Sequence, residues 1–210
     1  MKILVFGDNH GDLLSLLRLH DKAQEAEIAI CLGDFTYFSE DLSPLLEIMN
    51  ALPKKTYLTH GNHESEEEVR KQAKKHKNIS FHHKEIISVG DYKIIFYGGG
   101  GFAHIDEEFE DFMASIKKEI TDPAKTILIL HAPPAQTKLD VPFRDYHSGT
   151  LSFREFIEEV QPLAAFSGHI HETFGKQDNI QKTRLYNPGP EGIVIDLARL
   201  HAKRTQKKKK

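Results

Sequence analysis

Seven side chains with metal-binding oxygen or nitrogen atoms follow short apolar runs in this chain of 210 residues. The seven are Asp8, His10, Asp34, Asn62, His131, His169 and His171. Positions 8 and 10 are two residues apart, as are positions 169 and 171, so the members of each pair point the same way in extended chain. Carboxylate, amide and imidazole groups together suit divalent first-row metals. One ion does not need seven ligands, whereas two ions about 3.5–4 Å apart that share a carboxylate would use them.

The expected charge of such a site indicates what it would attract. Two divalent ions balanced by Asp8, Asp34 and one hydroxide leave a net charge of about +1. An anion would be drawn to this charge, and phosphate is the anion we expect. Because a bound metal lowers the pKa of water to about 7, the site would also supply a nucleophile at neutral pH.

The segments that precede these side chains read as buried strands. Apolar, β-branched runs at 2–6, 27–32, 55–59, 125–130 and 163–167 each end shortly before one or two of the seven residues. Ligands in open α/β sheets bind at the carboxyl ends of the strands, so these five ends can converge on one centre. The N-terminal half alternates strands with helices and the C-terminal half is richer in strands, which predicts an α/β sandwich with a mixed sheet.

Local signals predict where several elements begin or turn. Asp12 and Ser65 are expected to cap helices, and Ser152 reads as the start of another capping box. The Gly-Asp pair at 90–91 predicts a hairpin turn. The glycine-rich segment 97–102 lacks the Lys-Ser/Thr of a P-loop and reads as a tight turn near the site.

The turn GNHE, residues 61–64, joins a predicted strand to a highly charged helix. Turn preferences alone explain Gly61 and Asn62. Glu64 reads as an acid of the first helical turn, favoured by the helix dipole. The role of His63 therefore depends on the rest of the chain.

Composition limits the class of protein. Apolar residues make up 39% of the chain, and 210 residues fit one domain with a full core. No apolar run approaches the roughly 20 residues of a membrane span. The single cysteine, Cys31, cannot form an internal disulfide and reads as a buried strand residue, so a reducing cytoplasm is the expected location.

Charge is unevenly distributed along the chain. Residues 199–210 hold seven of the 28 Lys and Arg residues and no acid, so 21 basic residues face 31 acidic ones in the remainder, a net charge of −10. An acidic body is poorly suited to non-specific binding of nucleic acid. We expect residues 1–198 to form one domain and 199–210 to form a flexible basic tail. Contact of that tail with RNA or DNA is the less favoured alternative.

The ordered set of motifs resembles that of one known family. The motifs are D-x-H at 8–10, G-D at 33–34, G-N-H-E at 61–64, His131, G-H-x-H at 168–171 and N-P-G at 187–189. They are similar to those of the calcineurin-like metallophosphoesterases. Each motif alone is weak, whereas the ordered set, which spans most of the chain, is specific.

The resemblance implies a four-layer α-β-β-α sandwich with two mixed sheets and a site for two metal ions. The implied ligands of the two ions are Asp8, His10 and His171 for one, and Asn62, His131 and His169 for the other, with Asp34 bridging both. His63 would not bind metal but would face the phosphate, stabilising the transition state or protonating the leaving oxygen. We expect Mn²⁺, although a mixed nitrogen and oxygen set also accepts iron, nickel, cobalt and zinc.

The activity that the resemblance implies is metal-dependent hydrolysis of phosphate esters, with phosphodiesters favoured. A hydroxide that bridges the two metals would attack phosphorus in line. A phosphomonoesterase acting on a small metabolite and a non-catalytic metal-binding scaffold stay open as alternatives. Arg144 and His147, in the loop 132–150, are candidate contacts to the substrate.

Two departures from related proteins narrow the expected substrate. The related Ser/Thr protein phosphatases follow G-D with Asp and Arg residues that orient the catalytic His and bind phosphate. The segment 33–41, GDFTYFSED, has aromatic and hydroxyl residues at the positions that directly follow G-D, so a protein phosphatase is not expected. DNA-repair nuclease relatives carry a further domain after the catalytic one, and we do not expect one here.

Overall fold

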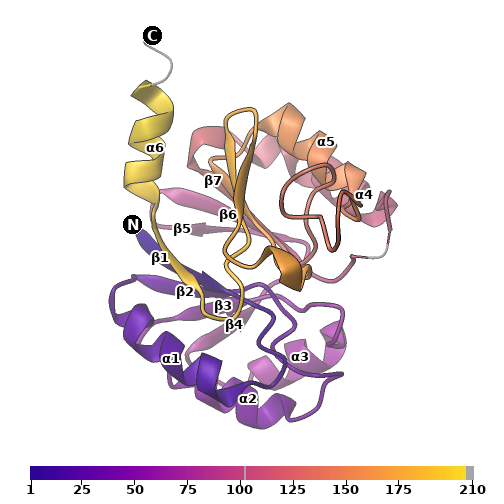
Figure 1. Ribbon diagram of the computed structural model, residues 1–210. Coiled ribbons are helices and arrows are strands. Elements are labelled where there is room, and N and C mark those ends of the chain that lie inside the picture. The colour runs from indigo at the N-terminus through magenta and orange to yellow at the C-terminus, as the bar shows by residue number, and fades with distance from the viewer. Residues whose placement is uncertain (102, 207–210) are drawn as a thin grey trace.

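The computed structural model describes residues 1–101 and 103–206, which form two packed sheets with helices on their outer faces (Figure 1). The first sheet has the spatial order β11-β1-β2-β3-β4. Its strands are Ile193–Asp196 (β11), Lys2–Phe6 (β1), Ile28–Cys31 (β2), Thr56–Leu58 (β3) and Ile79–Phe81 (β4). Strands β1 to β4 pair in parallel, and β11 pairs antiparallel with β1, so the sheet is mixed.

The second sheet has the spatial order β5-β6-β7-β8-β10-β9. Its strands are Glu85–Val89 (β5), Tyr92–Tyr97 (β6), Thr126–Leu130 (β7), Ala164–Phe166 (β8), Thr183–Tyr186 (β10) and Gln177–Ile180 (β9). The inner pairs are parallel, and the outer pairs β5-β6 and β9-β10 are antiparallel. Val89 pairs with Tyr92 in the β5-β6 ladder, which confirms the predicted hairpin turn at 90–91.

Helices connect the strands and cover the outer faces of both sheets. The α-helices are Leu13–Gln24 (α1), Leu42–Asn50 (α2), Glu66–Ala73 (α3), Glu107–Ile116 (α4), Leu151–Val160 (α5) and Leu197–Gln206 (α6). Short 3-10 helices lie at Lys117–Glu119 (η1), Pro123–Lys125 (η2) and His171–Thr173 (η3). In Figure 1, α1 to α3 lie against the first sheet, and α4 and α5 lie against the second.

Three apolar clusters lie between the four layers. Ile3 and Val5 of β1 belong to the cluster between the two sheets, whereas Leu4 and Phe6 belong to the one beneath α1 to α3. The third cluster joins the second sheet to α4 and α5. Because the central strands are buried on both faces, their sequences read as continuous apolar runs. The α-β-β-α sandwich with two mixed sheets is confirmed.

Two of the three predicted helix N-caps are confirmed. Asp12 accepts hydrogen bonds from the backbone of Leu14 and caps α1, and Ser65 caps α3. The prediction that Ser152 caps a helix is wrong, because α5 begins at Leu151 and its N-cap is Thr150. The Ser152 hydroxyl instead donates to a carboxylate of α4 and ties the two helices together.

Helix α6 extends into the segment where we expected a tail. Its residue Arg204 donates hydrogen bonds of 2.8 and 2.7 Å to the backbone carbonyls of Pro162 and Gln161. Residues 207–210 lie outside the described residues, and the domain boundary at 198/199 stays a prediction. Among the residues that the structure describes, no helix combines the length and apolarity needed to cross a membrane.

Candidate metal centre

Five strand ends bring the seven predicted side chains to one edge of the sandwich. Strands β1, β2 and β3 of the first sheet precede Asp8 and His10, Asp34, and Asn62. Strands β7 and β8 of the second sheet precede the remaining three histidines. The side chains that line the resulting cavity of about 490 Å³ are those of His10, Asp34, Tyr37, Asn62, His63, His169 and His171.

One group of donors consists of Asp8, His10 and His171. Its donor atoms lie within 4.8 Å of one another, and the Nε2 atoms of the two imidazoles are 3.0 Å apart. The Asp8 Oδ1 atom accepts a 2.9 Å hydrogen bond from the backbone of His169. The Asp8 Oδ2 atom is buried and has no hydrogen-bond partner among the described residues. A buried carboxylate oxygen without a partner is costly, which is what a cation would relieve.

A second group surrounds the amide oxygen of Asn62. The Nε2 atom of His131 lies 2.9 Å from Asn62 Oδ1, and the Nδ1 atom of His169 lies 2.8 Å from it. The Nδ1 atom of His131 lies 3.1 Å from the Leu32 carbonyl, to which only a protonated nitrogen can donate. This bond fixes the tautomer and leaves Nε2 as the ring atom that faces the cavity, as in known metal-binding histidines.

Asp34 lies between the two groups. Its Oδ2 atom is 3.8 Å from His10 Nε2 and 3.3 Å from His131 Nε2, while its Oδ1 atom accepts a 2.8 Å bond from the His63 backbone. Burial would raise the pKa of Asp34, but the neighbouring His131 and the hydrogen bonds hold it below its ordinary value. The carboxylate is therefore ionised and shared by both groups.

Four of the seven side chains project from left-handed backbone. The φ angles of Asp8, His10, Asp34 and His169 lie between 45° and 68°. Asp, Asn and His tolerate this conformation better than other non-glycine residues, but it is uncommon outside turns and functional sites. Three of these side chains, those of His10, Asp34 and His169, line the shared cavity, and Asp8 is buried.

His63 is held by the loop that follows Asp34. The ring of Phe38 stacks on it, with centroids 4.3 Å apart and an interplanar angle of 28°. The backbone N–H of Phe38 points at His63 Nδ1 over 3.4 Å, which leaves the proton of a neutral ring on Nε2. Tyr37, whose ring centroid is 5.5 Å away, completes an aromatic wall beside the ring.

Glu64 has a different role from the one expected. It is only 7% exposed, and its carboxylate accepts 2.8 Å hydrogen bonds from the backbone of Asp34, Thr36 and Gly61 and from the Thr36 hydroxyl. Burial raises the pKa of Glu64. Glu64 therefore joins the loop that carries Asp34 to the loop that carries Asn62. The prediction of an acid in the first helical turn is wrong, because Glu64 precedes Ser65, the N-cap of α3.

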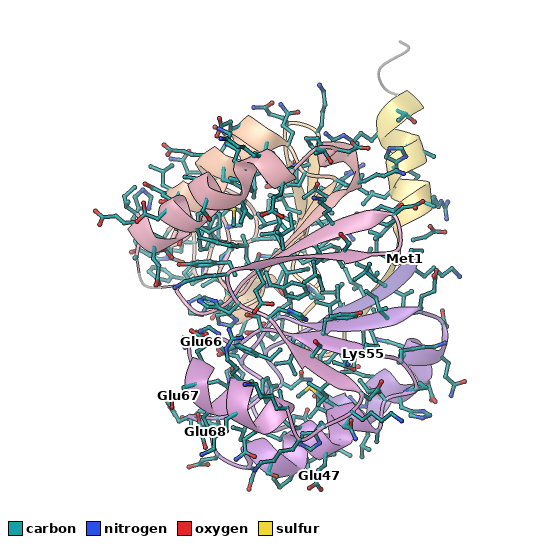
Figure 2. The ribbon with its side chains drawn as sticks, turned by 180° about the vertical axis from the view of Figure 1, so that it is seen from behind. Met1, Glu47, Lys55, Glu66, Glu67 and Glu68 are labelled. Atoms are coloured by element: carbon teal, nitrogen blue, oxygen red, sulfur yellow. The ribbon has the colours of Figure 1, made fainter. Side chains whose placement is uncertain are left out.

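The Glu64→Ala variant should be strongly destabilised, because buried N–H groups in both loops lose their acceptor. At about 1–3 kcal/mol for each unpaired group, the free energy of unfolding should fall by about 3 kcal/mol or more. Urea unfolding followed by circular dichroism measures this. The control is Glu67→Ala, since Glu67 is an exposed acid of α3 that points away from the protein (Figure 2). Equal stabilities of the two variants would contradict the role of Glu64.

The glycine turn after β6 lies against the site, as expected. A Cβ atom on Gly101 would lie 2.6 Å from His169 Nε2, so a larger residue would displace that ring. The Gly98 N–H donates a 3.0 Å hydrogen bond to His83 Nδ1. Because this bond occupies the lone pair of His83, its other nitrogen carries the proton and faces Glu66. Sequence reasoning missed this buried histidine, which supports the turn.

A second residue that sequence reasoning left without a role supports the G-H-x-H turn. The Asn187 amide, in the N-P-G motif, donates hydrogen bonds of 3.1 Å to the Ile170 carbonyl and 2.8 Å to the Thr173 hydroxyl. These bonds fix the backbone on both sides of His171 and thus orient one of the seven side chains.

The two candidate substrate contacts lie apart from this cluster. His147 Nδ1 is 2.7 Å from the buried carboxylate of Asp140, so the ring orders its own loop. Arg144 is exposed on the same loop, with a left-handed φ of 46°. Neither side chain is among those that line the cavity in the described part of the chain, and their contact with substrate stays a prediction.

Metal binding should release protons near neutral pH. Burial lowers the pKa of His131, but the carboxylates of Asp34, Asp8 and Glu64 together raise it to about 9. Burial raises the pKa of Asp8 to about 6. At pH 7 a cation must therefore displace the proton of His131, whereas below about pH 6 it must also displace that of Asp8. The apparent affinity should thus fall as the pH drops from about 9 to about 5. Calorimetry with Mn²⁺ in buffers of different ionisation enthalpy should show release of about one proton at pH 7, and equal heats would contradict it.

Comparison with known proteins provides independent information. A family model described as calcineurin-like phosphoesterase matches residues 1–173. No curated protein sequence matches the chain. Among solved structures, the Thermus thermophilus protein TT1561 is 16% identical with a TM-score of 0.75, and 95% of each chain is covered.

Two further similar structures are of proteins described by an activity. A protein described as a novel archaeal phosphodiesterase is 16% identical with a TM-score of 0.52, covering 90% of this chain and 84% of the other. A phosphopantetheinyl hydrolase from Mycobacterium tuberculosis is 13% identical with a TM-score of 0.60, covering 97% and 92%. At these identities the likeness shows a shared fold.

Proposed function

The chain belongs to the calcineurin-like phosphoesterase family, and from that premise we propose that it is a metal-dependent phosphodiesterase that works at the cavity described above. Membership makes it a phosphoester hydrolase with phosphate-ester substrates. The preference for diesters and the role of each residue are the parts that we propose.

We assign each group of neighbouring donor atoms to one cation. The proposed ligands are Asp8, His10 and His171 for the first ion, and Asn62, His131 and His169 for the second, with Asp34 shared. The position of Asp34 Oδ2, 3.8 Å from a ring nitrogen of one group and 3.3 Å from one of the other, is the observation that carries the proposal. Mn²⁺ is the metal we propose, and the mixed oxygen and imidazole set also suits iron, nickel, cobalt and zinc.

The residues around the centre prepare it for an anionic substrate. When bound, two divalent cations supply an activated water and neutralise charge that develops on phosphorus. Asp34 and three of the proposed histidine ligands line the cavity, so cations held there would face a phosphate group that enters it. His63, with its proton on Nε2, would donate a hydrogen bond to a phosphoryl or leaving oxygen.

Aromatic side chains beside His63 offer contact to an organic substituent of the phosphate. Tyr37 is 54% exposed and Phe38 is 65% exposed, so two aromatic side chains beside His63 offer apolar contact to a substituent. The similarity to a protein described as an archaeal phosphodiesterase supports this proposal. We also propose that the protein is cytoplasmic, because its single cysteine, Cys31, is free and buried.

Hydrolysis of paired chromogenic esters tests the proposal. Metal-stripped protein is given Mn²⁺ and assayed with bis-p-nitrophenyl phosphate and with p-nitrophenyl phosphate. Mn²⁺-dependent turnover that favours the diester is expected. A preference for the monoester would replace the proposal by a phosphomonoesterase. A protein that binds two metals but hydrolyses neither ester would fit a scaffold, and the proposal would be wrong.

A further inference from the structure

A second, smaller cavity lies between the β9-β10 hairpin and α6. It encloses about 120 Å³ and is lined by Leu163, Asn179, Gln181, Lys182, Arg184, Leu200, Lys203 and Arg204. Figure 1 shows α6 standing beside the hairpin. None of these residues lines the cavity of the metal centre. The cavity is therefore separate from the metal centre, and we call it the basic cavity.

Four cationic side chains and no acidic one line the basic cavity. Lys182 and Arg184 come from the hairpin, and Lys203 and Arg204 come from α6. Residues 1–198 carry an excess of acids, so four cations around one small cavity contrast with the net charge of the body of the protein. Like charges held together without counter-charges repel one another, and a bound anion relieves that repulsion.

Three of these four cations have unused hydrogen-bond donors. Among the described residues, no ion-pair partner or side-chain hydrogen bond involves Lys182, Arg184 or Lys203. The many other lysine and arginine side chains that form such contacts include Arg70 and Arg154, which pair with carboxylates. The three free cations could therefore engage a ligand without breaking an existing interaction.

The Arg204 side chain is held in place on one side of the basic cavity by two hydrogen bonds. Its guanidinium donates to the carbonyls of Gln161 and Pro162, and burial lowers its pKa, an effect that Asp122 opposes. Both bonds use terminal nitrogens and leave other N–H donors of the planar group available. The two leucines, Leu163 and Leu200, provide an apolar contact beside the charges.

The geometry points to a binding site for a small anion that carries two or more phosphate groups. Several cations set around a small cavity match the charge of a diphosphate better than that of a carboxylate, and guanidinium groups bind phosphate oxygens in pairs. The apolar wall would contact the organic part of such a ligand. This site is independent of the proposed hydrolysis, so either can fail without the other.

Inorganic pyrophosphate is the probe for the test. The full chain is titrated by calorimetry in the presence of EDTA, so that cations at the metal centre cannot hold the anion. Saturable binding is expected, and it should weaken at least about ten-fold in Arg184→Gln/Lys203→Gln, because charge-assisted hydrogen bonds are lost. Phosphodiester hydrolysis by this variant, measured separately with Mn²⁺, should be unchanged.

A matched variant distinguishes loss of the binding site from a general loss of positive charge. Lys71→Gln/Lys118→Gln removes the same charge from exposed residues that do not line the basic cavity, and it should bind pyrophosphate like the wild type. Equal weakening in both variants, or no saturable binding to the wild type, would overturn the inference. So would a short RNA that binds more tightly than pyrophosphate and depends on residues 207–210 but not on Arg184 and Lys203.

Discussion

Replacement of Asp34 by Asn is expected to lower phosphodiester hydrolysis by at least about 10³-fold and to reduce the bound metal. The amide keeps the shape of the side chain and can still accept the hydrogen bond from the His63 backbone. It removes the negative charge at the point where the two donor groups meet. Metal content by mass spectrometry and the hydrolysis rate should therefore fall together.

The control for this variant is Asp41→Asn, in the same segment of the chain. Asp41 is exposed and, like Asp34, has a left-handed φ, of 51°, which Asn also tolerates. It should keep wild-type activity and metal content. Wild-type rates from Asp34→Asn would contradict the assignment of this carboxylate to both ions.

Replacement of His63 by Ala should separate metal binding from turnover. Both ions should stay, because each proposed ligand group is intact, while kcat should fall by about 10²–10⁴-fold as the donor to phosphoryl or leaving oxygen is lost. His20→Ala, at a half-exposed histidine of α1, serves as the control and should leave both quantities unchanged.

The outcome for His63→Ala distinguishes two roles. The His63 ring lies within 4.8 Å of donor atoms of His10 and Asp34, so a direct role as a metal ligand is the competing account. A variant that loses one metal together with its activity would support that account. Wild-type kcat would show that His63 does not contact the reacting group.

The fold and the convergence of the seven side chains could be predicted from the apolar runs in the sequence and the polar residues that follow them. Runs such as residues 2–6 and 126–130 are apolar at nearly every position because the strands are buried on both faces. Parallel strands end at one edge, so the polar residues that follow them meet there. The family resemblance added the two ligand groups, whose roles stay predictions.

The supporting contacts could not be predicted, because they join loops that local sequence does not relate. Glu64 accepts hydrogen bonds from residues about 30 positions earlier, in a loop where Asp34 has a left-handed φ. Phe38, which stacks on His63, lies in the same loop and also has a left-handed φ, of 48°. The helical start of the basic tail depends on carbonyls of Gln161 and Pro162 that meet α6 only in the folded protein.

The central claim is that the cavity holds two divalent ions on which hydrolysis depends. The most direct measurement is a titration of metal-stripped protein with Mn²⁺ in which bound metal and hydrolysis of bis-p-nitrophenyl phosphate are followed in the same samples. Activity should be absent without metal and should reach its plateau at two bound ions per chain. Full activity without metal, or an inactive protein with two ions bound, would contradict the account.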